Sequence, residues 1–300
     1  MEKLRTALEI AKRSRRQQFS VADIEVARSP AEPDCAAWVS PNYCECDCLE
    51  LEPEKAGDNR CVGLFPDSFE MESYRVLRTQ ILQRTRHKGW NTLMITSPRP
   101  GEGKTITAIN LALTFAREFH QTILLVDCDL RRQKIHDYLG LSKEKGLGDY
   151  LIGGRPIQEL MVWPGVDSLT LISGGITVRD SAELIASPKM KSLVAEMKTR
   201  YSDRYVFFDV PPLLEGADAF TFAPLVDAIL MVVEEGRTSM NDVKEALDLI
   251  PQEKFLGFVL NRHKTAAKTY YGNGKSRTKT PRFWKSSNEP IGEQPNEVSL

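Results

Sequence analysis

Long apolar runs are missing from this 300-residue sequence. No run approaches the roughly 18 residues that a helix needs to cross a bilayer, and the start Met1-Glu-Lys-Leu-Arg5 lacks the apolar core of a signal peptide. An excess of positive charge is missing as well, since the formal net charge is -1. Without a global positive field, the sequence does not indicate a nucleic-acid partner. We therefore expect a cytoplasmic protein that does not bind nucleic acid.

Cysteine is too scarce for a disulfide scaffold, with six residues in the whole chain. All but one of them fall in the first 61 positions, namely Cys35, Cys44, Cys46, Cys48 and Cys61. Only one residue separates neighbouring thiols between Cys44 and Cys48, whereas paired zinc ligands normally have at least two residues between them so that the chain can turn around the ion. Free thiols in a loose segment are therefore favoured over a metal site.

The first 60 residues divide into a short basic helix and an irregular stretch. Leu4, Leu8 and Ala11 recur at helical spacing within residues 1–16, and lysines and arginines surround them. Such a helix lies on an anionic membrane surface, docks on a partner helix, or remains a solvated basic helix without a dedicated partner. From Ser29 to Asn59 the prolines, acidic residues and cysteines show no sustained period, which predicts a linker.

Strands and helices are predicted to alternate over residues 61–262, and a flexible tail is predicted over 263–300. The runs Ile123–Val126 and Tyr205–Phe208 are apolar throughout, as parallel strands buried on both faces must be. The pattern predicts an α/β fold with a mostly parallel central sheet and helices on both faces. The expected strands are near 92–97, 122–127, 168–172, 204–209, 227–233 and 255–260, and the expected helices are near 69–82, 104–118, 181–199 and 239–249.

A glycine-rich loop joins the apolar run Leu93–Ile95 to a helix. Its sequence is Ser97-Pro-Arg-Pro-Gly-Glu-Gly-Lys-Thr105, in which Pro98 takes the place of the usual first glycine. Closely set glycines let backbone N–H groups turn toward phosphate oxygens, a lysine reaches the terminal phosphates, and the hydroxyl after it ligates magnesium. The pattern predicts a nucleoside triphosphate site. The residues expected to bind the nucleotide are Arg99, Pro100, Gly101, Glu102, Gly103, Lys104, Thr105 and Ile106.

Two of the apolar strands end in an aspartate, Ile123–Asp127 and Tyr205–Asp209. Because ligands of an open parallel sheet bind at the carboxyl ends of its strands, both carboxylates are expected beside the phosphate loop. Mg²⁺ on a triphosphate needs hard oxygen ligands, or carboxylates that hold its waters. We therefore expect Thr105, Asp127, Asp129 and Asp209 to hold the Mg²⁺ that accompanies ATP.

The segment Asp127-Cys-Asp129-Leu-Arg131-Arg132 resembles the second Walker A-type motif of bacterial tyrosine kinases. Asp209-Val-Pro211-Pro212 resembles the aspartate and proline pair of the same family. The resemblance covers about residues 69–262. It implies a P-loop NTPase fold of the MinD/ParA-like superfamily and an ATP-dependent protein-tyrosine kinase that governs capsule or exopolysaccharide export.

The resemblance also implies roles for individual side chains in phosphoryl transfer, which depends on positioning and charge neutralisation. Asp127 is expected near the acceptor tyrosine, as its proton acceptor or to orient its hydroxyl. The remaining roles are phosphate binding by Lys104, support of the metal by Asp129, support of its water shell by Asp209, and stabilisation of developing charge by Arg131.

Glu72, Arg75 and Arg78 fit the Glu-x-x-Arg-x-x-Arg pattern that mediates self-assembly in this family. Steps of three place such side chains within about 120° of one another on a helix, where they are able to pair with a neighbouring subunit. The alternative is an exposed helix whose own charges pair at i,i+3. The resemblance therefore implies a homo-oligomer.

Asn261 ends the last predicted strand, where P-loop ATPases of this kind have an asparagine near the nucleotide base. A strand-end cap is the alternative for this residue. The implied phosphoacceptors are Tyr270 and Tyr271, the two tyrosines that follow the sheet. The alternative for them is that both rings pack the tail onto the domain.

Because no membrane span is predicted, the resemblance implies a separate membrane protein, a chain-length determinant or polysaccharide co-polymerase, that activates the kinase. Such a partner would hold it at the inner face of the plasma membrane. Two rival functions remain open. The first is a MinD-like partitioning ATPase, although those proteins have a lysine where this chain has Arg99. The second is a non-catalytic regulator that binds nucleotide to gate a polysaccharide export complex.

Overall fold

The computed structural model describes residues 47–49, 51–65, 68–118, 121–142, 145–201 and 203–263. The predicted N-terminal helix, the thiols of Cys35, Cys44 and Cys46, and the predicted acceptors Tyr270 and Tyr271 lie outside these residues. The chain divides into a compact unit that ends at Asn261 and a second unit that starts at Arg262. All the helices and strands below belong to the first unit.

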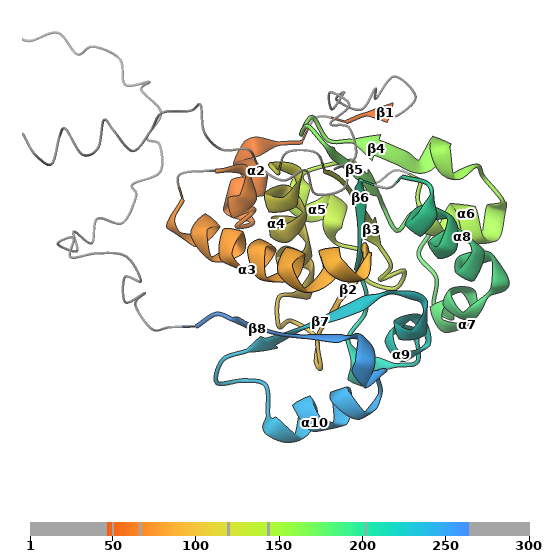
Figure 1. Ribbon diagram of the computed structural model, residues 1–300. Helices are drawn as coiled ribbons and strands as arrows, with labels where there is room; N and C mark the ends of the chain where they lie inside the picture. The colour runs from red at the N-terminus through yellow and green to blue at the C-terminus, as the bar shows by residue number, and fades with distance from the viewer. Residues whose placement is uncertain are drawn as a thin grey trace, which may run out of the picture. The chain divides into compact units, whose positions relative to one another are not determined.

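The compact unit is built on an eight-stranded sheet in the order β1-β4-β5-β3-β6-β2-β7-β8 (Figure 1). Neighbouring strands are parallel, except that β4 runs antiparallel to β5. This confirms the predicted α/β fold with a mostly parallel sheet. The strands are β1 (Asp47–Cys48), β2 (Thr92–Thr96), β3 (Thr122–Asp127), β4 (Met161–Trp163), β5 (Leu169–Ile172), β6 (Arg204–Asp209), β7 (Ala228–Glu234) and β8 (Phe255–Asn261).

Helices cover both faces of the sheet (Figure 1). The helices α2, α3, α4 and α5 lie on one side, and α6, α7, α8 and α9 lie on the other. No helix in the described ranges is both long enough and apolar enough to cross a membrane. The helices are α2 (Pro53–Asp58), α3 (Phe69–Thr85), α4 (Lys104–Ala116), α5 (Ile135–Leu139), α6 (Leu147–Gly153), α7 (Ser181–Ala186), α8 (Pro188–Thr199), α9 (Asp218–Phe222) and α10 (Met240–Asp248).

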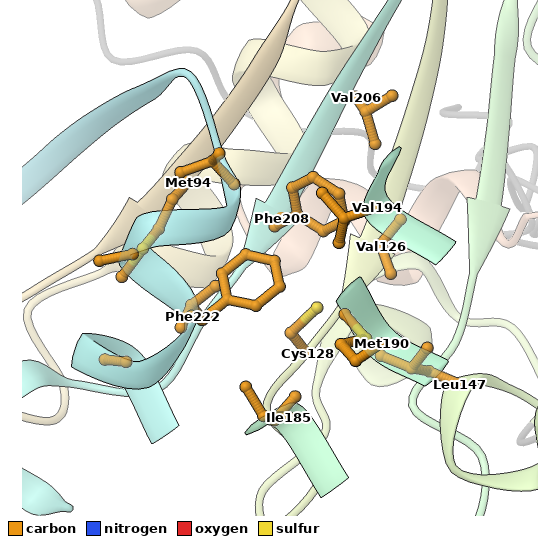
Figure 2. Packing of buried hydrophobic residues seen from close by; sticks show 14 of the residues in the cluster. Met94, Val126, Cys128, Leu147, Ile185, Met190, Val194, Val206, Phe208 and Phe222 are labelled. Atoms are coloured by element: carbon orange, nitrogen blue, oxygen red, sulfur yellow. The ribbon is translucent and has the colours of Figure 1, made fainter. Parts of the chain in front are cut away.

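The wholly apolar strands are explained by burial on both faces of the sheet. Along β6, Tyr205 and Phe207 belong to the hydrophobic cluster on the α4 side, whereas Val206 and Phe208 belong to the cluster on the other side. Figure 2 shows Phe208 against Phe222 of α9, with ring centroids 5.0 Å apart. Burying each such ring stabilises the fold by about 1.5–3 kcal/mol relative to leaving it exposed.

One predicted helix is divided in two by Ser187 and Pro188. The sequence predicts a single helix over 181–199, but α7 ends at Ala186 and α8 begins at Pro188. The Ser187 hydroxyl accepts a hydrogen bond from the Met190 backbone N–H, and Pro188 occupies the first position of α8, where its missing N–H costs nothing. The prediction of one continuous helix was therefore wrong.

The predicted linker also contains regular structure near its end. Residues Asp47–Cys48 form β1 and pair with β4, and Pro53–Asp58 form α2. The segment is attached to α5, because the Asn59 side chain donates hydrogen bonds to the backbone carbonyls of Asp137 and Tyr138 at 3.3 and 3.1 Å. The linker prediction was wrong for these residues, since elements of two and six residues are too short to show a hydrophobic period.

The strand order places the two strand-end aspartates next to each other. β6 lies between β3 and β2, and the register pairs Asp127 directly with Asp209. The loop after β2 leaves the same edge of the sheet. The carboxyl ends of β3, β6 and β2 thus form one site, as expected for ligand sites of open parallel sheets.

Candidate active site

The phosphate loop connects β2 to α4 and depends on two glycines. Gly101 has a φ of +82° and Gly103 a φ of +96°, both in the left-handed region that residues with a Cβ rarely adopt. Gly103 is also crowded, because a Cβ there would lie 2.1 Å from Nδ2 of Asn261. The loop leads into α4, whose N-terminus supplies backbone N–H groups of the kind that bind phosphates.

Lys104 lies between two carboxylates at the start of α4. Its Nζ is 3.0 Å from Oδ2 of Asp129 and 3.3 Å from Oδ1 of Asp209. Burial lowers the pKa of Lys104, but the attraction of Asp209, Asp129 and Asp127 outweighs it, so this pKa lies above its ordinary value. The ammonium group is therefore charged, and the carboxylates form a ready-made site for positive charge.

Asp209 links the loop to β6. Its Oδ2 accepts a hydrogen bond of 2.6 Å from the Thr105 hydroxyl. Burial raises the pKa of Asp209, and the nearby Lys104 and Thr105 only partly oppose this effect. A bound cation would favour the ionised carboxylate.

Asp127 shapes the loop that follows β3. Its Oδ1 accepts from the backbone N–H of Asp129 at 3.1 Å, and its Oδ2 accepts from the N–H groups of Lys134 and Ile135 at 3.1 and 3.2 Å. Burial and the charge of Asp209 raise the pKa of this carboxyl. Backbone N–H groups thus occupy three of the roughly four lone-pair positions of the Asp127 carboxylate. Asp127 therefore holds the loop in shape, a role that its position at a strand end does not predict.

Cys128 stands between Asp127 and Asp129 in the sequence, but its side chain points into the hydrophobic core. Cys128 lies fully buried in the hydrophobic cluster with Val126 and Met190 (Figure 2). Burial raises the pKa of its thiol well above the ordinary value, so it remains protonated. The Cys128 side chain thus anchors the loop in the core, on the opposite side from the carboxylates.

The predicted metal ligands converge around Lys104 and Thr105. Within the described ranges, no group of three or more His, Cys, Asp or Glu side chains is arranged to hold a metal ion directly. Mg²⁺ does not need one, because it keeps several waters and uses one or two carboxylates together with phosphate oxygens. Thr105 and Asp209, with Asp129 beside them, fit this kind of binding better than a full set that includes Asp127.

Arg131 pairs with residues of α7 and α9. Its Nε donates to the Ser181 hydroxyl at 2.9 Å, and its Nη2 lies 3.3 Å from Oδ2 of Asp218. Asp218 and Ser181 are both buried, so the guanidinium supplies positive charge to a buried carboxylate. In this arrangement Arg131 connects the β3 loop to α7 and α9, and its predicted role toward the transferred phosphate stays a prediction.

Replacing Arg131 with alanine should lower the free energy of unfolding by about 1–2 kcal/mol, because it leaves the buried Asp218 carboxylate with one partner fewer. Urea denaturation measures this change. The neighbouring Arg132 is the matched control, since its pair with Glu215 is largely exposed and its loss should cost less than about 0.5 kcal/mol. Equal stabilities of the two variants would contradict the assignment.

The other predicted nucleotide-binding residues pair with groups on α10, on β8 and in the segment between β7 and α10. The Arg99 guanidinium pairs with Asp242 of α10 at 2.9 Å. The Glu102 carboxylate accepts from the Arg99 backbone N–H and from the Thr238 hydroxyl. Asn261 donates from Nδ2 to the Glu102 backbone carbonyl at 2.8 Å, so it lies against the loop. The predicted contact of Asn261 with the nucleotide base stays a prediction, and the sequence does not indicate Thr238.

The predicted assembly motif lies on α3, and its three charged residues have different contacts. Glu72 and Arg75 form an exposed ion pair of 3.1 Å on the surface. Arg78 instead packs within the domain, where it donates to the Thr114 carbonyl at 2.9 Å and pairs with Glu118 at 3.0 Å. The i,i+3 pair that the sequence left as an alternative is therefore present, and Arg78 has partners of its own.

Comparisons with known proteins agree with this geometry. Residues 93–276 match the CobQ/CobB/MinD/ParA nucleotide binding domain family. The tyrosine-protein kinase YwqD of Bacillus subtilis is 32% identical over 209 residues, which cover 69% of this chain and 87% of YwqD. The putative tyrosine-protein kinase EpsB of Ralstonia nicotianae is 31% identical over 66% of this chain, but the match spans only 26% of EpsB.

A solved structure is similar as well. The kinase domain of the Escherichia coli tyrosine kinase ETK superposes with a TM-score of 0.62 at 28% identity, and the match covers 71% of this chain and 84% of that domain. The residues that match the family model, 93–276, include the phosphate loop and both strand-end aspartates. The chain therefore belongs to the bacterial tyrosine kinase family, with a nucleotide-binding domain of the CobQ/CobB/MinD/ParA type.

Proposed function

We propose that this chain transfers the terminal phosphoryl group of ATP to tyrosines of neighbouring subunits and thereby regulates capsule or exopolysaccharide production. One observation carries the proposal. Lys104, Thr105, Asp129 and Asp209 meet within hydrogen-bond distance at the carboxyl edge of the sheet. This is the set of groups that phosphate binding and a magnesium ion require.

The residues of the site act mainly by position and charge. When bound, ATP supplies the phosphoryl group and Mg²⁺ neutralises its oxygens. Lys104 and the N–H groups of the loop hold the phosphates, and Thr105 and Asp209 hold the metal with its waters. The acceptor phenol oxygen bonds to the terminal phosphorus, the bond from that phosphorus to the ADP oxygen breaks, and ADP leaves with the electron pair.

The phenol proton passes to a carboxylate of the site, for which we propose Asp127. Burial raises the pKa of this carboxyl, which brings it closer to the range of an effective general base. Three backbone N–H groups fix its orientation, and about one lone-pair position is left to receive a proton.

Phosphotyrosine mapping tests the proposal. The purified chain is incubated with Mg-ATP and digested, and mass spectrometry locates the phosphate, with Tyr270→Phe, Tyr271→Phe and the double variant in parallel. Phosphate on Tyr270 or Tyr271, lost in the matching variant, is the expected result. Nucleotide binding without transfer would favour the non-catalytic regulator, and ATP hydrolysis without phosphotyrosine would favour the partitioning ATPase.

Self-assembly is proposed to use the exposed pair of α3. Because Arg78 is already paired inside the domain, we expect Glu72 and Arg75 to carry the contact between subunits. The variant Glu72→Ala/Arg75→Ala should shift the oligomer toward monomer in size-exclusion chromatography with light scattering. The control removes another exposed ion pair, between Glu196 of α8 and Arg200 just after that helix, and should leave the oligomer unchanged. Unchanged mass in both variants would refute this assignment.

We also propose that a membrane chain-length determinant activates the kinase at the inner face of the plasma membrane. The proposal comes from the family resemblance alone. Co-expression with such a membrane protein should move the chain into the membrane fraction and raise its phosphotyrosine content. A chain that stays in the soluble fraction with unchanged phosphotyrosine would refute it.

A further inference from the structure

The outer side of the phosphate loop is covered by the segment between β7 and α10, residues 235–239. The Arg237 guanidinium lies over the loop, with Nη1 3.5 Å from the Gly101 carbonyl and Nη2 3.4 Å from the Pro100 carbonyl. A second link is the pair between Arg99 and Asp242 of α10. Arg237 and Asp242, which lie far from the phosphate loop in the sequence, thus hold the loop in place.

A buried glutamate, Glu102, makes a further contact between the phosphate loop and this segment. Glu102 is only 1% exposed, although it belongs to a loop that binds anions. One carboxylate oxygen accepts from the Arg99 backbone N–H at 2.9 Å, and the other accepts from the Thr238 hydroxyl. The Thr238 oxygen in turn accepts from the Glu234 backbone N–H at 2.8 Å. The hydroxyl therefore uses its donor and an acceptor position at once, which fixes its orientation.

This arrangement has a clear electrostatic cost. Burial raises the pKa of Glu102, and an ionised carboxylate beside a triphosphate would repel it. The Thr238 hydroxyl and the Arg99 N–H fix the position of this carboxylate. Its partners include a backbone N–H of the loop itself, so the same contact fixes the loop backbone.

We propose that Thr238 is a positioning residue for nucleotide binding, which acts through Glu102 to hold the phosphate loop in its binding conformation. The inference rests on the proposed use of this loop for ATP. Without the hydroxyl, one Glu102 oxygen has no donor, and the carboxylate is free to turn and release the Arg99 N–H. The loop then samples other conformations. The apparent affinity for nucleotide falls in proportion to the fraction of molecules that keep the binding conformation.

The test compares Thr238→Val with Thr238→Ser, which removes a methyl group but keeps the hydroxyl. Titration with a fluorescent ADP analogue and Mg²⁺ should show at least about a tenfold weaker affinity for Thr238→Val and an affinity within about twofold of the unmodified chain for Thr238→Ser. The control Thr199→Val removes a hydroxyl that only contacts its own helix, and should bind as the unmodified chain does. Thermal unfolding is measured on every variant.

Wild-type affinity in Thr238→Val would overturn the inference, and so would a lower unfolding temperature with unchanged affinity. Glu102→Ala removes the other partner of the same hydrogen bond and replaces Thr238→Val in the test if that variant does not fold. The two changes together should weaken binding no more than either alone, whereas additive losses would show that the residues act independently. Failure of the unmodified chain to bind the analogue would instead refute the proposed nucleotide site.

Discussion

Methionine in place of Lys104 should reduce phosphotyrosine formation by a factor of at least about 100, the range found when one preorganised electrostatic group is removed from an active site. Methionine matches the length of the lysine stem but carries no charge, so phosphate oxygens lose their main cation. The three carboxylates around the former ammonium group also lose their shared counter-charge, and their repulsion then opposes the arrival of a nucleotide. Immunodetection of phosphotyrosine after incubation with Mg-ATP measures the effect.

The matched control for this variant is Lys191→Met. Lys191 is exposed on α8, on the opposite face of the sheet from α4, so the same chemical change there should leave phosphorylation intact. Circular dichroism of both variants should show native secondary structure. Phosphorylation at the unmodified rate in the Lys104 variant would remove this residue from the phosphate site.

Asparagine in place of Asp209 should also lower phosphorylation at least about 100-fold, but it should not destabilise the fold. Burial raises the pKa of Asp209, so its ionised form is less favourable in the folded chain than in the unfolded one. Folding stability therefore falls as the pH rises through this pKa, and a neutral side chain removes that loss. Asparagine still offers an oxygen to the Thr105 hydroxyl, but it has no charge for Lys104 or a metal.

Urea denaturation without nucleotide at neutral pH checks the stability part of this prediction. The free energy of unfolding should be equal to or higher than that of the unmodified chain, whereas the phosphotyrosine signal is lost. Asp167→Asn, at an exposed position, should change neither property. A large loss of stability in the Asp209 variant would mean that the ion pair with Lys104 outweighs the cost of burial.

Six of the eight strands were predicted, because the central strands carry a strong signal, whereas β1 and β4, with two and three residues, were not. The strands β3 and β6 begin and end at the predicted residues, since a wholly apolar run closed by an aspartate marks both the buried segment and its carboxyl end. The same rule placed Asp127 and Asp209 side by side. The short helices α5, α6 and α9, with five to seven residues each, give no measurable period and were not predicted.

The break between α7 and α8 had a signal that the period obscured. Ser187 and Pro188 form an N-cap followed by a first-turn proline, yet the apolar spacing continues across them. The orientation of Arg131 and the partners of Glu102 had no comparable signal. Thr238 follows Glu102 by 136 positions, and nothing local to either residue indicates that the fold brings them together.

The contact between Asn261 and the phosphate loop has a consequence for how the chain is made. Asn261 is the last residue of the compact unit and lies 159 positions after Glu102, whose backbone it holds. The ribosome therefore releases the loop long before the strand that completes it. A nascent chain that stops short of β8 lacks Asn261, so its phosphate loop forms without this hydrogen bond.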